Sequence, residues 1–332
     1  MGEIKFKTWL TETFGCAYPI IQGGLGYLSD AELVAAVSNA GCLGTLTTYQ
    51  YKTADNVRAE IQRVRKLTDK PFGANINLFP AYSVVDTKSI AEVVAEEKLP
   101  FVETAGRAPE KWLIDMLHQA GTKVIHKVPS VRFAVHVQES GVDAVTMIGF
   151  EGGGHPGIEE VSSMVLVPCA VDSTKLPIIA AGGVADGRGL VAALALGAQG
   201  VLMGTRFMMT KECKIHDNLK RRLTEARETD TIIIDHAIRS SRRVLRNATA
   251  ERVLGIQQLD PKIEELLTYM GGEVSRRLWQ YGELDTGVIA CGQSVGLAND
   301  IPSVNELVQR IVTQAEHILH GLNSIAGICN QS

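Results

Sequence analysis

A histidine in a loop made largely of glycine is the residue of this sequence best suited to move a proton. The stretch from Met147 to Gly157 reads MIGFEGGGHPG, and five of its eleven residues are glycine. A loop with so few side chains has little packing role of its own and can wrap around a ligand. An imidazole titrates near neutral pH, so it can act as a general acid or base. His155 is therefore the candidate catalytic residue.

Two further glycine-rich loops indicate a phosphate site. Gly182-Gly183 and Gly204-Thr205 each follow a short apolar run, and one helical pattern separates them. The loops after the last two strands of a (β/α)8 barrel commonly bind phosphate through exposed backbone N–H groups. Each glycine alone would also fit a tight turn, but two such loops one strand–helix unit apart favour phosphate.

Polar residues also end the strands that are expected earlier in the chain. Asn75 follows an apolar run, where its amide could hold a heteroaromatic ring or satisfy loop backbone. Lys127 lies in an apolar strand, where a charge is costly unless it meets an anion or an electron-rich ring. Gly23-Gly24-Leu25-Gly26 lacks the spacing of a dinucleotide fingerprint, and it fits either a flat ligand or a plain turn.

The elements that must position these residues alternate between strand and helix. Helical patterns over 55–67, 90–98, 109–120 and 131–140 separate short apolar runs. The eight expected strands cover residues 19–23, 42–46, 72–77, 100–104, 123–128, 143–148, 177–181 and 200–204. Eight strands in this alternation predict an α/β fold, a (β/α)8 TIM barrel, with residues 1–18 covering one end. Ser29 is expected to cap the first barrel helix.

The alternation of strand and helix patterns stops after residue 210, which predicts an added domain. Residues 211–289 carry basic helical stretches over 214–227 and 238–253, so we expect a mostly helical lid domain inserted before the closing helix. The predicted division is therefore a barrel over 1–210, a lid over 211–289 and a return segment over 290–332. In that return segment Gln293 could bring an amide near the ligand, and 303–322 reads as the closing helix.

Composition excludes several classes of function. The 332 residues carry a formal net charge of −4, which gives no electrostatic footprint for nucleic acid or a membrane surface. The N-terminus does not read as a signal peptide, and no run of 18 apolar residues occurs, so we expect a cytoplasmic protein. Six scattered cysteines indicate buried, reduced thiols, with neither zinc nor any other metal site.

The chain resembles the nitronate monooxygenase family, formerly called 2-nitropropane dioxygenases. That family takes in similar FMN-dependent NADH:quinone reductases and an FMN-dependent enoyl-ACP reductase. The resemblance covers nearly the whole chain and rests on PIIQGGLG, the Asn75 strand end, GFEGGGHPG, the segment 177–207 and GQSVGL. It implies FMN at the barrel mouth and a catalytic histidine at His155. The cofactor-binding residues that it implies are Gly23, Gly24, Leu25, Asn75, Lys127, Glu151, Gly152, Gly182, Gly183, Gly204, Thr205 and Gln293.

The reaction that this resemblance implies is oxidation of an alkyl nitronate with O2 to a carbonyl compound and nitrite. His155 would steady the nitro oxygens or remove the α-proton, and Lys127 would stabilise negative charge on the reduced ring. The alternative keeps FMN but uses NADH as reductant, with a quinone or an enoyl thioester as acceptor. Arg246-Asn247 and MGTRFMMT are nearest the quinone-reductase branch. The expected partners are thus small molecules and O2, and a homodimer is compatible with the sequence.

A function from another class also fits the phosphate loops. An isomerase or aldolase on a non-redox barrel could use the same loops for a phosphorylated metabolite, and such a protein would be colourless. The segment 180–204 is also similar to the IMP dehydrogenase family, but that chemistry needs a nucleophilic cysteine after strand six. The loop here has His155 and no cysteine.

Overall fold

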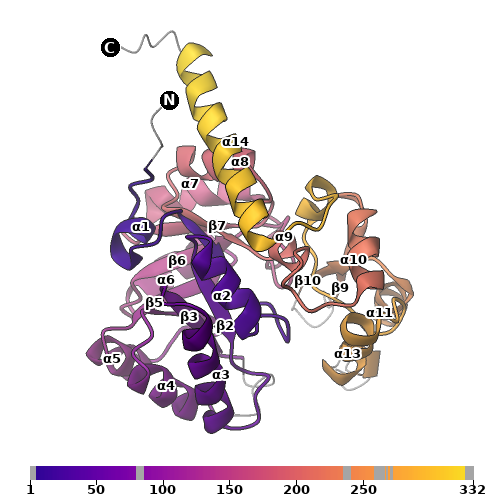
Figure 1. The fold of residues 1–332 in the computed structure, drawn as a ribbon, viewed down its shortest axis with the longest axis horizontal. Coiled ribbons are helices and arrows are strands. Elements are labelled where there is room, and N and C mark those ends of the chain that lie inside the picture. The colour runs from indigo at the N-terminus through magenta and orange to yellow at the C-terminus, as the bar shows by residue number, and fades with distance from the viewer. Residues whose placement is uncertain are drawn as a thin grey trace.

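The computed structural model describes residues 5–79, 86–234, 241–257, 266, 268–269 and 272–325. Eight parallel strands in the order β1-β8-β7-β6-β5-β4-β3-β2 form the wall of a barrel (Figure 1). The barrel closes where the Gln22 amide donates to the Leu43 carbonyl and the Leu43 amide to the Ile20 carbonyl, both at 2.9 Å. The strands are β1 (Ile20–Gln22), β2 (Gly44–Thr47), β3 (Phe72–Asn77), β4 (Phe101–Ala105), β5 (Lys123–Val128), β6 (Ala144–Ile148), β7 (Ile178–Ala181) and β8 (Gly200–Met203). The predicted TIM barrel is confirmed.

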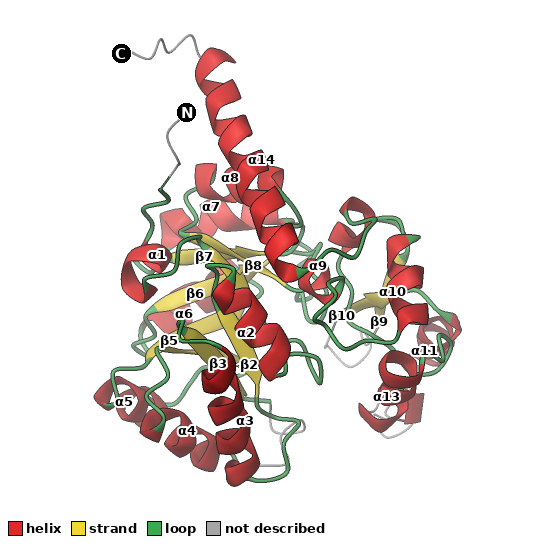
Figure 2. Ribbon diagram, in the orientation of Figure 1, coloured by secondary structure: helices red, strands yellow, loops and turns green. Residues whose placement is uncertain are grey.

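Helices between the strands cover the outside of the barrel (Figure 2). They are α2 (Ala31–Asn39), α3 (Ala54–Leu67), α4 (Thr87–Glu96), α5 (Lys111–Gln119), α6 (Val131–Gln138), α7 (Ser163–Ser173) and α8 (Gly187–Ala195). Two shorter helices, α1 (Trp9–Phe14) and α9 (Thr205–Met208), precede β1 and follow β8. The prediction that Ser29 caps α2 is wrong, because the Asp30 carboxylate accepts from the Leu33 amide there. The Ser29 hydroxyl instead accepts from the Leu25 amide at 2.7 Å and so folds the loop after β1.

The end of the barrel opposite the glycine-rich loops is apolar and closed. Phe101, Ile125 and Ile179 form one buried cluster with Leu10 and Phe14 of α1. The rings of Phe14 and Phe101 lie 5.3 Å apart. Helix α1 therefore covers this end, as expected for the N-terminal segment, and leaves the carboxyl ends of the strands as the place for a ligand.

The described residues between 211 and 289, which we call the lid, form a lobe beside the barrel (Figure 1). The described elements of the lid are α10 (Asp217–Thr224), β9 (Thr231–Ile234), β10 (Arg242–Leu245), α11 (Ala248–Gln257) and α13 (Gly272–Tyr281). The helix predicted over 238–253 is wrong at 242–245, where β10 pairs antiparallel with β9. The strand conformation is favoured because Val244 pairs with Ile232 of β9, and both side chains pack in an apolar cluster within the lid.

The return segment contains the 3-10 helix η2 (Gln293–Leu297) and the closing helix α14 (Val304–Ile325). α14 packs mainly against α8 and α2. Gly187 allows this close approach, since a Cβ there would lie 2.5 Å from the Ala315 nitrogen and 2.6 Å from the Ile311 oxygen. The predicted closing helix is confirmed, and it completes the outer layer of the barrel.

The cysteines differ from the expectation at one position. Cys169 on α7 is exposed, whereas we expected every thiol to be buried. Cys329 lies outside the described residues. The buried free thiols are Cys16, Cys42, Cys213 and Cys291.

Candidate active site

A polar layer lies inside the barrel at the carboxyl ends of the strands. Asn75 on β3 lies opposite Glu103 on β4, and its side-chain amide donates to the Glu103 carbonyl at 3.3 Å. The Glu103 carboxylate forms an ion pair with Lys127 of β5, with 1% and 22% of the two side chains exposed. Lys127 is thus paired, as its cost in an apolar strand requires. The sequence predicted that Asn75 and Lys127 lie at the ends of the strands, but the role of Glu103 beside them was not predicted.

The loop after β1 folds closely onto this polar layer. The Gly24 amide donates to the Glu103 carboxylate at 3.3 Å. A Cβ at Gly24 would lie 2.9 Å from the Cβ of Asn75, and a Cβ at Gly23 would lie 2.6 Å from Leu202 Cδ2. Both glycines are therefore needed for close packing, which places the backbone of this loop at the barrel mouth.

The loops after β7 and β8 offer free backbone donors. Gly182 and Gly183 have φ angles of +90° and +78°, a conformation that favours glycine. A Cβ at Gly204 would meet only Leu25 Cδ2, at 3.4 Å, so this position faces open space. Within the described part of the chain, the N–H groups of Gly183 and Gly204 donate to no other group. Free amides beside Thr205, the first residue of α9, are what a phosphate needs.

The return segment reaches the same loops. The Gly292 amide donates to the Thr205 hydroxyl, and the Gln293 amide donates to the Glu151 carbonyl, both at 2.9 Å. A Cβ at Gly153 would lie 2.7 Å from the Gly292 nitrogen. Gln293 therefore lies beside the loops after β6 and β8, although it is more than eighty residues beyond Thr205 in the chain.

The Glu151 side chain holds the loop after β6 to the helix that follows it. Its carboxylate accepts from the Ser163 amide at 3.0 and 3.1 Å and from the Ser163 hydroxyl at 3.1 Å. That hydroxyl also lies 3.1 Å from the Gly182 carbonyl. Gly152 packs tightly, because a Cβ there would lie 2.7 Å from Ile148 Cγ1. These contacts support a role for Glu151 and Gly152 in shaping the loop.

His155 lies in the middle of this loop, which spans residues 149–162 between β6 and α7, near two cationic side chains. Its ring centroid is 5.9 Å from that of Phe79, at an angle of 35°. Part of its surface stays open to solvent, and protein surrounds the rest. Burial, with the positive charges of Arg242 and Lys127, lowers the pKa of His155 from 6.5 to about 4. In the free protein His155 is therefore neutral near pH 7, whereas about a quarter of the imidazole would be protonated at its usual pKa of 6.5.

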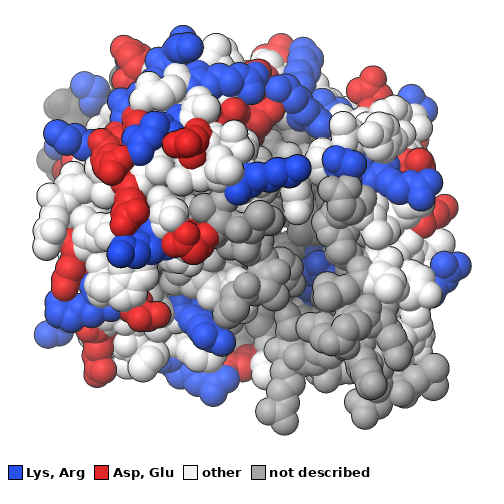
Figure 3. All heavy atoms as spheres, turned by 90° about the horizontal axis from the view of Figure 1, so that it is seen from below, with Lys and Arg blue, Asp and Glu red and all other residues white. Residues whose placement is uncertain are grey.

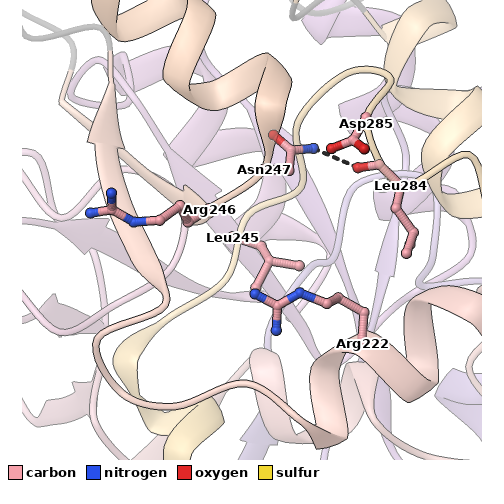
Figure 4. A pocket seen from close by; sticks show the side chains of 6 residues that line it. All are labelled: Arg222, Leu245, Arg246, Asn247, Leu284 and Asp285. Atoms are coloured by element: carbon pink, nitrogen blue, oxygen red, sulfur yellow. Dashed lines mark hydrogen bonds between the residues drawn. The ribbon is translucent and has the colours of Figure 1, made fainter.

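A separate pocket of about 190 Å³ lies within the lid (Figure 4). It is lined by Arg222, Leu245, Arg246, Asn247, Leu284 and Asp285. Arg246 pairs with Glu251 at 2.6 Å. The Asn247 amide donates to the Leu284 carbonyl at 2.8 Å, and the Ala248 amide donates to the Asp285 carboxylate at 3.1 Å. These groups hold the end of β10 to the loop before the return segment, so the pocket lies at a structural contact between the two segments.

The face of the molecule in Figure 3 carries charges of both signs. Lys and Arg side chains there are interspersed with Asp and Glu side chains. No helix in the described ranges combines the length and the apolar character needed to cross a bilayer.

Comparison with known proteins identifies the family. The sequence model described as nitronate monooxygenase matches residues 7–314. A (3aS,4S,5R,7aS)-5-hydroxy-7a-methyl-1-oxo-octahydro-1H-indene-4-carboxyl-CoA dehydrogenase from Mycobacterium tuberculosis is 33% identical, over 94% of this chain and 97% of its own. A Staphylococcus haemolyticus protein named "Probable nitronate monooxygenase" is 31% identical, over 95% of this chain and 98% of its own. The solved structure of FabK from Thermotoga maritima has a TM-score of 0.89 and 35% identity, over 97% of this chain and 100% of its own. The chain therefore belongs to the nitronate monooxygenase family, and it is accordingly an oxidoreductase with a flavin cofactor.

Proposed function

We propose that this protein is an FMN-dependent oxidoreductase that oxidises alkyl nitronates with O2 to a carbonyl compound and nitrite. The observation that carries the proposal is the charge around His155. Lys127 and Arg242 lie near enough to lower the pKa of this neutral imidazole. Lys127 is paired with Glu103, so Arg242 is the main positive charge beside the neutral imidazole. A positive charge next to a neutral hydrogen-bonding group favours a small anion, and a nitronate is such an anion.

The residues at the barrel mouth fit FMN. Its phosphate would accept from the free amides of Gly183 and Gly204, and the Thr205 hydroxyl can donate while it accepts from Gly292. Asn75 and Lys127 would face the ring from the polar layer of the barrel. The chemistry that bound FMN would supply is acceptance of electrons from the substrate carbon and their delivery to O2.

His155 would act on the substrate as a neutral imidazole. One ring nitrogen can donate a hydrogen bond to a nitro oxygen, and the other can accept the α-proton of a neutral nitroalkane. A bound anion would raise the pKa of His155 again, because an opposite charge favours the protonated form. Phe79 at 5.9 Å would help to orient the imidazole.

Replacing Gly204 with Ala is expected to weaken FMN binding by about tenfold or more without lowering the stability of the apoprotein. The added methyl group has space in the folded chain, since its one neighbour is Leu25 at 3.4 Å, but it enters the volume proposed for the phosphate. Fluorescence titration of the apoprotein with FMN gives the Kd, and thermal unfolding gives the stability.

Gly255→Ala is the matched control for Gly204→Ala. Gly255 lies in α11, and a Cβ there would meet nothing within 4 Å. This exposed helix position should gain about 0.5–1 kcal/mol of stability and keep its FMN affinity. An unchanged Kd in Gly204→Ala would remove Gly204 from the phosphate site.

A second candidate is an NADH-dependent reductase of a thioester or a quinone. The observation that favours it is the identity of 33% with a dehydrogenase whose name specifies an acyl-CoA substrate, against 31% for the named nitronate monooxygenase. Both reactions would use the same barrel mouth and the same cofactor, so the partner molecules distinguish them.

Anaerobic stopped-flow absorbance of the FMN-loaded protein tests the two candidates. For a nitronate monooxygenase we expect a nitronate to bleach the flavin band within the time of one turnover and NADH to leave it unchanged. Fast bleaching by NADH, followed by recovery on addition of a quinone or an enoyl thioester, would instead establish the reductase.

A further inference from the structure

Strand β10 of the lid binds the backbone directly before His155. β10 pairs with β9, and its Arg243 amide also donates to the Gly154 carbonyl at 2.7 Å. The Gly154 amide returns a hydrogen bond of 3.0 Å to the Arg243 carbonyl. This reciprocal pair is an isolated antiparallel bridge between the lid and the loop after β6. The position of His155 therefore depends on an element of the lid.

The Arg243 side chain holds the start of the same loop. It is 4% exposed, and its Nε donates to the Phe150 carbonyl at 3.0 Å. One terminal nitrogen, Nη1, donates to the Thr231 hydroxyl on β9 at 3.0 Å. The guanidinium carbon lies 4.6 Å from the centroid of the Phe150 ring. One arginine thus binds the loop at Phe150 through its side chain and at Gly154 through its backbone.

Burial of this guanidinium without a close carboxylate is costly. Among the described residues, no carboxylate lies within salt-bridge distance of Arg243. A carbonyl, a hydroxyl and an aromatic ring contact the guanidinium, and the Glu151 carboxylate acts on its charge from farther away. A long apolar side chain could fill the same volume at lower cost. Only the planar, multiple-donor guanidinium can bind the loop and β9 at once.

We propose that Arg243 is a positioning residue, which fixes the loop between Phe150 and His155 against the lid so that the imidazole reaches the barrel mouth. The inference rests on the proposed role of His155. Loss of the Arg243 contacts would let this loop of glycines relax, because it has few side-chain contacts of its own. A displacement of about 1 Å at a catalytic group can cost about a hundredfold in rate.

Arg243→Lys is the test variant, because lysine keeps the charge but cannot bind both Phe150 and Thr231. We expect kcat with a nitronate to fall by about tenfold to a hundredfold, with the KM and the FMN Kd within about twofold of wild type. Thr231→Val removes only the contact to β9 and should give a smaller loss. Arg246→Lys is the control, since Arg246 pairs with Glu251 at the surface of the lid and should leave kcat unchanged.

The pH profile separates positioning from general destabilisation. Lys127, which pairs with Glu103, and Arg242 face His155, and burial keeps its pKa at about 4. A loosened loop would expose His155 to solvent, so in Arg243→Lys the acidic limb of kcat/KM for a nitroalkane should move up from pH 4 toward 6.5. Arg246→Lys should keep the wild-type limb. Lower stability alone would not move this limb.

Hydrogen–deuterium exchange supplies a readout that needs no turnover. Faster exchange in residues 150–155 of Arg243→Lys and Thr231→Val, but not of Arg246→Lys, is the expected result. Unchanged exchange together with unchanged kcat and pH limb in the Arg243 and Thr231 variants would overturn the inference. Faster exchange in these variants, with full turnover in His155→Ala, would instead show that the loop is positioned but that the function proposed for His155 is wrong.

Discussion

Replacing His155 with Ala is expected to lower kcat with a nitroalkane by about 10²- to 10⁴-fold, the range that general acid–base groups contribute. FMN should stay bound, because the proposed phosphate contacts come from the loops after β7 and β8, which do not include His155. The loss should be smaller with a preformed nitronate, which has no α-proton left to remove. Steady-state oxygen consumption with both substrates, together with the visible spectrum of the variant, measures these effects.

The pH dependence of turnover shows whether His155 acts in its neutral or in its protonated form. His155 has its pKa lowered to about 4, so the neutral base is fully present at pH 7 and is lost as the pH falls through about 4. Wild-type kcat/KM for a nitroalkane should therefore fall on acidification toward pH 4, and this limb should be missing in His155→Ala. His136→Ala, at an exposed position of α6, is the control and should behave as wild type. Full turnover of FMN-loaded His155→Ala would rule out His155 as the catalytic group.

The barrel could be predicted from sequence because its signals are local. Each strand is a short apolar run between helical patterns, and the strand from Lys123 to Val128 has the predicted bounds. The glycine-rich loops could also be predicted, because a pair such as Gly182-Gly183 indicates a backbone conformation that other residues rarely adopt. Both residues do have positive φ angles. Local periodicity therefore gave the architecture and the end of the barrel that carries the ligand.

Contacts between distant segments could not be predicted in the same way. Arg243 meets Phe150 across 93 residues of sequence, and nothing in the run RRVL distinguishes an exposed basic face from a buried guanidinium. The antiparallel pair of β9 and β10 was not predicted for a related reason, since residues 242–245 continue a basic pattern that also fits a helix. Their strand conformation depends on pairing with β9.

Glu103 is the exception, because the sequence contained its signal. It lies in the otherwise apolar run FVETA, just as Lys127 lies in KVIHKV, and each charge is costly in a strand unless it is paired. Two opposite charges on consecutive strands of a barrel, both pointing inward, satisfy that need together. Counting inward positions on both strands would have predicted the ion pair before the structure.

Replacing Lys127 with Met is expected to destabilise the apoprotein by about 3–5 kcal/mol, the cost of leaving one member of a buried ion pair alone. The Glu103 carboxylate is 1% exposed, and among the described residues the hydrogen bond that remains to it is the one from the Gly24 amide at 3.3 Å. Water could reach the unpaired Glu103 carboxylate only if the loop after β1 moved. Urea unfolding of the apoprotein at pH 7 measures the free energy of unfolding.

The double variant Lys127→Met/Glu103→Gln separates the charge from the volume. Gln keeps the shape of Glu103 and can still accept from Gly24, so most of the stability lost in Lys127→Met should return. Glu103→Gln alone should cost less than Lys127→Met, because the Lys127 side chain is 22% exposed and its ammonium can still reach water. The coupling between the two sites should then be large and favourable. If the costs of the single changes simply add in the double variant, the pair does not hold the polar layer together, and Lys127 must be placed by other contacts.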